Sequence, residues 1–118
     1  ERVLSTTAYD AWVIYWPAGI ELDLHDHGGS FGAFSVVGGQ LDEDRVVDGQ
    51  RHTVRLAAGQ TVAFGPDHVH AVANRTSRPA TSLHVYSPPL AAMAFYDTEH
   101  DGALRLVGED AGPWSDRA

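Results

Sequence analysis

Two segments decide the fold of this chain: GIELDLHDH at residues 19–27 and GPDHVHAVAN at residues 65–74. In an extended strand, side chains two residues apart point to the same face. His25 and His27 can therefore present two imidazoles side by side, and His70 sits in a second strand-like stretch. Because imidazole is the commonest metal ligand of proteins, we predict a metal site between two β-strands.

Turn residues recur at short intervals around these segments. The chain has 12 glycines and 6 prolines, spread between stretches rich in Val, Leu, Ile and aromatic residues. This pattern is typical of an all-β sandwich or barrel, and no helical periodicity of useful length appears. We expect one domain over residues 1–118. The expected strands are Ala11–Trp16, Glu21–Asp26, Gly32–Val37, Leu41–Val47, Arg51–Leu56, Thr61–Phe64, Val69–Asn74, Thr81–Tyr86, Met93–Tyr96 and Ala103–Val107.

Composition excludes several classes of protein. The net charge is −8 and the 8 basic residues are scattered, so we expect no nucleic-acid partner. No apolar run approaches the roughly 20 residues of a membrane helix, and no signal peptide is recognisable. We therefore expect a cytoplasmic protein with no membrane partner. The absence of cysteine excludes disulfides, a thiol nucleophile and thiolate metal ligands.

The acidic excess concentrates in two places, Asp42-Glu43-Asp44 and the tail around Glu109-Asp110. We expect both to be solvated loops that favour solubility. The chain begins with Glu1 and not with Met, so we expect a trimmed form of a longer protein.

Three neutral histidines that leave positions open describe a catalytic metal centre better than a structural one, because closed structural sites usually use four ligands. Alternate residues of each strand in a β-barrel point inward, so His70 can reach the same point as His25 and His27. The ligand type alone does not select the metal, because imidazole serves Zn, Cu, Fe and Ni. An incidental cluster of polar side chains is the alternative.

The spacing of these residues resembles that of the cupin superfamily, which implies a small all-β barrel of the double-stranded β-helix or jelly-roll type. The two resembling motifs are Gly19-x5-His25-x-His27-x11-Gly39 and His70-x3-Asn74. Most cupins carry a ligating Glu shortly after the H-x-H, where Gly32 stands in this chain. The branch that lacks this Glu and keeps three histidines is the thiol dioxygenases, of which cysteine dioxygenase is the best known.

A third segment strengthens the resemblance. Ser82-Leu83-His84-Val85-Tyr86 closely resembles the cysteine dioxygenase stretch that carries a Ser-His-Tyr relay outside the metal ligands. Strand periodicity puts Ser82, His84 and Tyr86 on one face, where they can pass hydrogen bonds toward a metal. The following Ser87-Pro88 resembles the cis peptide bond of the family. The run HDHGGSFGAF, residues 25–34, resembles the bacterial form.

The resemblance implies one Fe(II) ion per chain, bound by His25, His27 and His70, with Zn or Ni as alternative occupants of the isolated protein. The thiolate and amine of the substrate would take two open positions and dioxygen the last. Three neutral ligands leave the ion its full charge, which favours an anionic thiolate. By resemblance, Tyr86 hydrogen-bonds the substrate or the oxygen, while His84 and Ser82 hold its phenol. Animal enzymes cross-link this Tyr to a Cys, which the present chain lacks.

The resemblance also bears on substrate choice. Cysteine dioxygenases hold the substrate carboxylate with an Arg on a strand upstream of the H-x-H, whereas enzymes for 3-mercaptopropionate have Gln there. Arg2 is the only upstream arginine, and Arg2-Val3-Leu4 resembles the Arg-x-Leu of that strand. An Arg fork fits a carboxylate bidentately. A terminal arginine exposed to solvent is the alternative.

Three further residues are expected to support the barrel. Trp12 and Trp16 alternate along one strand and should pack in its interior. His68 lies two residues before His70, and we expect it to form a hydrogen bond at the rim. A contact with substrate or with a metal ligand is the alternative for His68.

We therefore expect a thiol dioxygenase that converts L-cysteine to cysteine sulfinic acid, acting on a small thiol and O2 as a monomer or small homo-oligomer. The first alternative keeps this chemistry and changes the substrate to 3-mercaptopropionate or another small thiol. The second is of another class, a non-catalytic cupin that binds a metal or a ligand. A three-histidine site also suits Zn²⁺, which can activate water.

Overall fold

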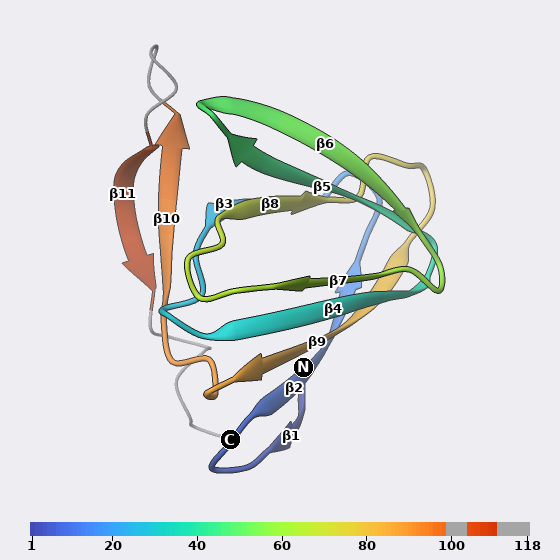
Figure 1. Cartoon of the computed structure of the whole chain (residues 1–118). Helices are drawn as coiled ribbons and strands as arrows, with labels where there is room; N and C mark the ends of the chain where they lie inside the picture. The colour runs from blue at the N-terminus through green and yellow to red at the C-terminus, as the bar shows by residue number, and fades with distance from the viewer. Residues whose placement is uncertain (99–103, 111–118) are drawn as a thin grey trace.

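Two antiparallel β-sheets face each other in the computed structural model, which describes residues 1–98 and 104–110 (Figure 1). The first sheet contains, in spatial order, β1 (Arg2–Ser5), β2 (Asp10–Trp16), β9 (Ala80–Ser87), β4 (Phe31–Gly38) and β7 (Thr61–Phe64). The second contains β11 (Leu104–Asp110), β10 (Met93–Thr98), β3 (Glu21–His25), β8 (His70–Ala73), β5 (Gln40–Val47) and β6 (Gln50–Ala57). No helix occurs within the described ranges, and hence none there is long and apolar enough to cross a bilayer.

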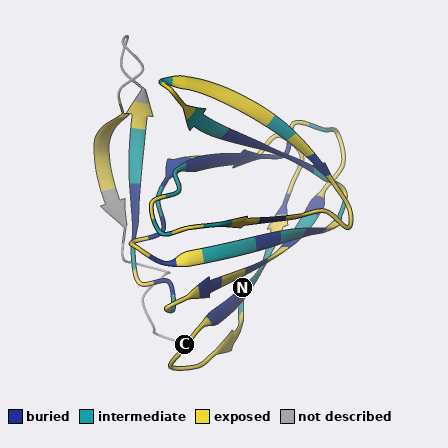
Figure 2. Cartoon of the chain, in the orientation of Figure 1, coloured by how far each residue is buried: buried dark blue, intermediate teal, exposed yellow. Residues whose placement is uncertain are grey.

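The hydrophobic core lies between the two sheets. Because alternate residues of a strand point to opposite faces, each sheet contributes every second side chain to the core. Phe34 from β4, Leu41 from β5 and Val72 from β8 meet there, almost without exposure to solvent. Strand β8 is buried along its whole length (Figure 2). A second cluster, formed by Tyr86, Leu90 and Met93, fills the end of the sandwich near the histidines.

The all-β prediction is confirmed, and each expected strand is present, most of them with ends within two residues of the expected ones. Strand β1 is an addition that pairs Leu4 with Ala11, and it was indicated only by the resemblance around Arg2. Strand β11 runs to Asp110, so the expectation of a loop around Glu109-Asp110 is wrong. The Ser87-Pro88 bond is cis, as the resemblance implied.

The expectation of a solvated loop at Asp42-Glu43-Asp44 is also wrong. The three acids lie in the middle of β5 and are 4%, 0% and 5% exposed. Burial of a carboxylate is costly unless it is paired and hydrogen-bonded, and each of these carboxylates has such partners. The partners come from distant parts of the chain, which is why the acidic run alone resembled a loop.

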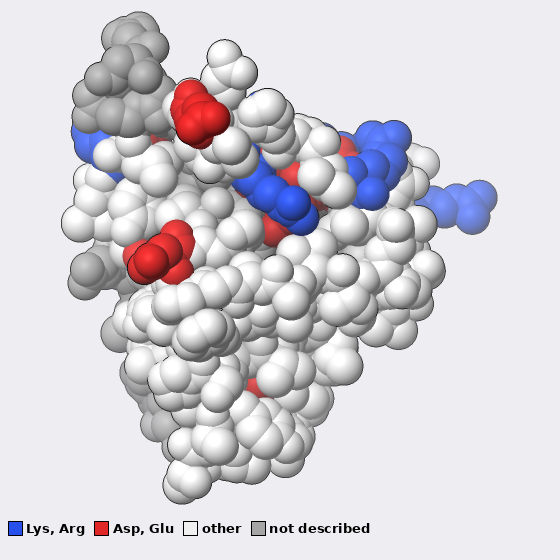
Figure 3. All heavy atoms as spheres, in the orientation of Figure 1, with Lys and Arg blue, Asp and Glu red and all other residues white. Residues whose placement is uncertain are grey.

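Arginines cover the outer side of β5. Arg51, Arg55 and Arg75 form ion pairs with Asp42 or Asp44, at nitrogen–oxygen distances between 2.8 and 3.4 Å. Figure 3 shows blue and red groups side by side in the upper part of the molecule, whereas the lower part of this face is almost uncharged. The basic residues of β6 therefore neutralise buried acids.

Candidate metal centre

The three predicted histidines converge in the structure. His25 ends β3 and lies directly opposite His70, which begins β8, while His27 follows β3 by two residues. The ring centroids of the three imidazoles are 4.8 to 4.9 Å apart, and one donor atom of each lies within 4.8 Å of the others. Each histidine is 1–2% exposed. The structure thus brings together three side chains that could hold one metal ion.

The turn after β3 places His27, although the sequence assigned it to the face of a continuing strand. Asp26 anchors this turn, because its carboxylate accepts hydrogen bonds from the backbone of Gly28 and Ala94 and from the Tyr96 hydroxyl. Gly28 has a φ of 59°, and a Cβ there would lie 2.8 Å from the Ala92 carbonyl oxygen. The turn therefore requires glycine at position 28. Asp26 and Gly28 are functional supports that the strand interpretation missed.

Burial keeps the three imidazoles neutral. Desolvation, followed by the charge of His70, lowers the pKa of His25 to about 3 and that of His27 to about 2. Burial also lowers the pKa of His70, although the adjacent Glu43 opposes this shift. Neutral imidazole is the form that binds metals, so all three side chains are ready to act as ligands at ordinary pH.

The hydrogen-bond partners of the histidines fit a cation. The Nδ1–H of His25 donates to the Asp23 carbonyl at 2.6 Å, and the Nδ1–H of His70 donates to Glu43 at 2.6 Å. Each of these two rings therefore keeps its Nε2 lone pair. Both ring nitrogens of His27 are buried and have no hydrogen-bond partner among the described residues. Buried polar atoms are rarely left unpaired, and a metal ion would satisfy one of the two ring nitrogens of His27.

Phe64 occupies the space from which a side chain at position 32 could have joined the group. A Cβ at Gly32 would lie 2.4 Å from the Cζ atom of Phe64 and 3.1 Å from Cδ1 of Tyr86. The Phe64 ring packs on His27, with 4.5 Å between ring centroids, and occupies the space that a side chain at position 32 would need. The centre is therefore limited to three protein ligands on this side.

The predicted relay residues form a buried hydrogen-bonded chain on β9. The Ser82 hydroxyl lies 2.7 Å from Nε2 of His84, and Nδ1 of His84 lies 3.2 Å from the Tyr86 hydroxyl. The Tyr86 ring stacks beside His27 at 5.5 Å between centroids. Burial lowers the pKa of His84 to about 3 and raises the pKa of Tyr86 above its ordinary value. The relay is thus neutral throughout and ends next to the histidines.

Trp16 extends the hydrogen-bonded series of Ser82, His84 and Tyr86 and fixes the direction in which its hydrogen bonds are donated. Its Nε1–H donates to the Ser82 hydroxyl at 2.8 Å, a role that sequence analysis missed when it assigned Trp16 to packing alone. Ser82 is fully buried, and its own hydrogen has a described acceptor only in Nε2 of His84. His84 then carries its proton on Nδ1 and donates it to the Tyr86 oxygen. The hydroxyl hydrogen of Tyr86 stays available for a ligand.

Arg2 lies on the same sheet as Tyr86. It pairs with Trp12 across β1 and β2, and Trp12 in turn pairs with His84. Directly opposed residues of neighbouring strands share a face, so Arg2 is on the inward side, about 10 Å from His84 by two strand spacings. Its guanidinium lies 5.9 Å from the centroid of the Trp12 ring, which packs against Tyr86. Arg2 is half-buried, and its role as the carboxylate clamp stays a prediction.

Glu43 is the main residue that sequence analysis missed. It lies under His70 and His68, and its carboxylate is within hydrogen-bond distance of both. The signal was available in the spacing, because Glu43 is two residues after the fully buried Leu41 and therefore points to the same inward face. A hydrogen bond of His68 at the rim was expected, but the structure shows the alternative: His68 bonds to the fully buried Glu43, and its ring lies 4.8 Å from that of His70.

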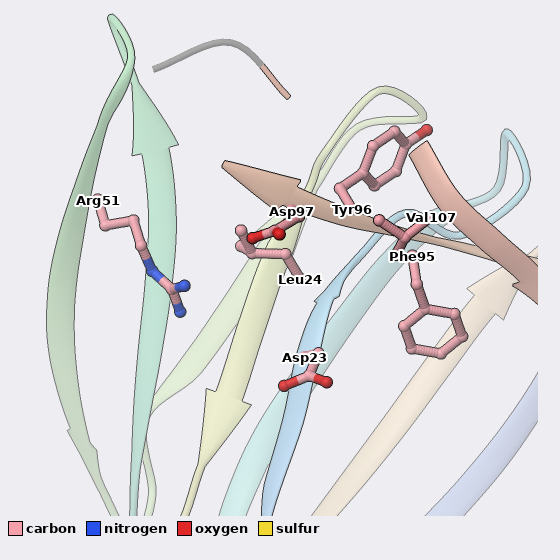
Figure 4. Close-up of a pocket in the computed structure, with 7 residues that line it drawn as sticks. All are labelled: Asp23, Leu24, Arg51, Phe95, Tyr96, Asp97 and Val107. Atoms are coloured by element: carbon pink, nitrogen blue, oxygen red, sulfur yellow. The ribbon is translucent and has the colours of Figure 1, made fainter. Parts of the chain in front are cut away.

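A separate pocket of about 390 Å³ contains none of the predicted site residues (Figure 4). It is lined by Asp23, Leu24, Arg51, Phe95, Tyr96, Asp97 and Val107. Arg51 is already paired with Asp44, and Asp97 with Arg105. Two of the three charged side chains at this pocket are thus engaged in ion pairs, and we assign the chemistry to the histidine cluster.

Comparison with known proteins agrees with the fold and the residue pattern. An uncharacterized conserved protein with a double-stranded beta-helix domain from Klebsiella pneumoniae superposes with a TM-score of 0.69 at 24% identity, over 79% of this chain and 78% of that chain. A protein of Thermus thermophilus superposes with a TM-score of 0.65 at 21% identity, over 74% of this chain and 79% of that chain. The cupin domain of Cnp3 from Schizosaccharomyces pombe superposes with a TM-score of 0.66 at 12% identity, over 74% of this chain and 61% of that chain. At these identities the likeness shows the fold, and the predicted cupin-type fold is confirmed.

The family follows from the sequence match. The family described as cysteine dioxygenase type I matches residues 2–99, which include the histidine cluster, the relay and Arg2. This chain belongs to the cysteine dioxygenase type I family.

Proposed function

We propose that this chain is a mononuclear non-haem iron thiol dioxygenase that converts L-cysteine to cysteine sulfinic acid. The observation that carries the proposal is the cluster of three buried, neutral imidazoles, from His25, His27 and His70, in a chain of the cysteine dioxygenase family. Three neutral donors with no carboxylate among the ligands suit a centre that must accept an anionic thiolate.

Iron(II) held by these histidines would supply binding of the thiolate and activation of O2. The reaction is RSH + O2 → RSO2H, in which both oxygen atoms go to sulfur. Sulfur loses four electrons and O2 gains them, so no further reductant is required. The protein must therefore bind the thiol, orient it and control the nearby proton.

The relay of Ser82, His84 and Tyr86 would control the proton near the bound thiol. Because burial raises the pKa of Tyr86, its phenol stays protonated at ordinary pH and can donate a hydrogen bond to the substrate or to oxygen. His84 and Ser82 would hold the phenol in place from behind. Phe64 and Met93 would exclude water from the reacting sulfur.

The decisive experiment measures oxygen uptake by the iron-loaded protein with cysteine, 3-mercaptopropionate and cysteamine, and identifies the product by mass spectrometry. We expect one O2 consumed per thiol and a sulfinate as the product, with cysteine the best substrate. Protein loaded with Zn²⁺ is the control and should consume no oxygen. If iron binds and no thiol yields a sulfinate, the protein is a non-catalytic cupin and the proposal is wrong.

Arg2→Gln distinguishes the two substrates. We propose that the guanidinium binds the substrate carboxylate, so the variant should raise KM for cysteine by about 10-fold or more, as expected for loss of a charge-assisted pair. Turnover of cysteamine, which has no carboxylate, should not change. Unchanged cysteine kinetics would show that Arg2 does not bind the carboxylate and would favour another thiol as the substrate.

Tyr86→Phe tests the relay. The variant removes only the hydroxyl, so we expect kcat to fall by about 10- to 100-fold with unchanged metal affinity. Tyr15→Phe is the matched control, because the Tyr15 side chain is 64% exposed and on the opposite face of the sheet. Steady-state oxygen uptake and metal titration measure the two quantities. Equal kcat in both variants would contradict a role of the phenol.

A further inference from the structure

Glu43 is a fully buried carboxylate at the base of the histidine cluster. It is 0% exposed in the middle of β5, on the face that points between the sheets. Its Oε2 atom accepts from Nδ1 of His70 at 2.6 Å and from Nε2 of His68 at 3.0 Å. Its Oε1 atom accepts from Nε of Arg45 at 2.5 Å. No function assigned so far uses this residue.

The carboxylate is ionised despite its burial. Its oxygen atoms accept hydrogen bonds from His68, His70 and Arg45, and donors of this kind favour the ionised form of a carboxyl group. The paired arginine is 36% exposed at its side chain, so the charge of Glu43 is compensated from the rim of the sheet. A negative charge thus lies one imidazole ring away from the Nε2 atom of His70.

We propose that Glu43 is a positioning residue for the metal centre: it fixes the tautomer and orientation of His70 and strengthens that ligand electrostatically. The inference rests on the proposed metal centre. A carboxylate that accepts from the far nitrogen of a ligating histidine holds the ring and raises its basicity. His68 donates to the same oxygen atom and holds the carboxylate where it can accept from His70.

The three histidines differ in this respect, and the difference supports a specific role. His25 donates to a neutral carbonyl, that of Asp23, whereas His27 has no partner among the described residues and His70 has an anionic one. Of the three, His70 is therefore the one whose ring donates to a charged group among the described residues. Glu43 therefore strengthens His70 as a ligand. The carboxylate acts on the metal through His70 and does not itself occupy a coordination position.

A second arrangement of the same atoms needs to be distinguished. Glu43, His68 and His70 also form a group whose donor atoms lie within 4.8 Å of one another, so they could hold an ion of their own. That site would need Nδ1 of His70, which carries the proton donated to Glu43. His70 would have to lose its one remaining ring N–H proton to bind two ions. The short hydrogen bond favours the positioning role.

The test compares Glu43→Gln, Glu43→Ala and the control Asp42→Asn. Asp42 is equally buried on the same strand but points outward to Arg55 and Arg75, so Asp42→Asn removes a charge without touching a histidine. Affinities for Fe(II), measured without oxygen, and for Co²⁺ are obtained by competition with a chelator. We expect Glu43→Gln to weaken both by about 10- to 100-fold and Glu43→Ala to weaken them at least as much. The control should match the parent protein.

A second readout separates positioning from folding. ¹⁵N NMR of the metal-free protein should show His70 as the Nδ1–H tautomer in the parent and in Asp42→Asn, and a tautomer mixture in Glu43→Gln. This variant keeps the size of the side chain, so the comparison stands even if Glu43→Ala does not fold.

The outcomes are distinguishable. Parent-like metal affinity in Glu43→Gln overturns the inference, as does binding of two ions per chain with one lost in that variant. A parent protein that binds neither ion overturns the metal centre and the inference together. A parent that binds iron but forms no sulfinate overturns only the proposed function, and the affinity series still decides the role of Glu43.

Discussion

Replacing His27 with leucine should stabilise the metal-free protein by about 1–3 kcal/mol and at the same time abolish its metal binding. Both ring nitrogens of His27 are buried without a hydrogen-bond partner among the described residues, and an unsatisfied buried polar group costs about this much. Leucine fills a similar volume between Phe64 and Tyr86 and has no polar atoms. Urea unfolding in the presence of a chelator measures the free energy of unfolding, and metal titration measures binding.

His70→Leu is the matched comparison and should have the opposite effect on stability. Its removal leaves the buried Glu43 carboxylate without the hydrogen bond from Nδ1 of His70, and an unsatisfied buried group costs about 1–3 kcal/mol, or more when it is charged. Both variants should lose metal binding. If His27→Leu is destabilised as much as His70→Leu, then the ring of His27 is not an unsatisfied group and the argument from its nitrogens fails.

The metal-free protein should lose stability steeply as the pH falls below about 6.5. The pKa values of His25, His27 and His84 are lowered in the folded state to about 3, 2 and 3, and that of His70 is lowered as well. The unfolded chain therefore binds these protons near pH 6.5, whereas the folded chain does not. A histidine with a depressed pKa thus contributes a stability that is complete at pH 7 and is lost between about 6.5 and its folded pKa.

The magnitude is large because four groups act together. Each contributes about 1.4 kcal/mol per pH unit within its window, or about 5 kcal/mol per unit for all four. Domains of this size have a free energy of unfolding of about 5–15 kcal/mol, so unfolding should be complete before the histidines titrate in the folded state. Glu43 and Asp44 have lowered pKa values as well, so their stabilising effect is lost below about pH 4, in the same direction.

The measurement is urea unfolding from pH 8 to pH 4 with a chelator present, repeated with bound metal. Metal binds only neutral imidazoles, so it should move the acid transition to lower pH. His52→Gln is the control, because the His52 side chain is exposed, and it should leave the profile unchanged. A stability that stays constant from pH 7 to pH 5 would contradict the burial of neutral histidines.

Local patterns accounted for the strands and for the candidate ligands. Turn residues and period-two alternation depend on neighbours a few positions apart, so Thr61–Phe64 was predicted to the residue and β9 to within one residue at each end. The relay followed from the same periodicity, since Ser82, His84 and Tyr86 share a face of one strand. These features can be read from the chain because the interactions that create them are local.

Features that depend on distant contacts could not be predicted in this way. Glu43 was assigned to a loop because its partners, His68 and His70, are 25 and 27 residues away. Trp16 was assigned to packing because its acceptor, Ser82, is 66 residues away. In each case the role of a polar group depends on which partner meets it in the interior, and burial makes that partner obligatory.

The sequence by itself determined that this chain is an all-β protein with three histidines and a Ser-His-Tyr segment in fixed spacings, because strand periodicity is a local property. Only the tertiary structure decided what surrounds those histidines: a carboxylate under His70, a carbonyl behind His25 and, within the described ranges, no hydrogen-bond partner for His27. It also placed Phe64 in the space beside Gly32. The physical reason is that desolvation, pairing and steric exclusion are set by residues that meet only when the two sheets pack.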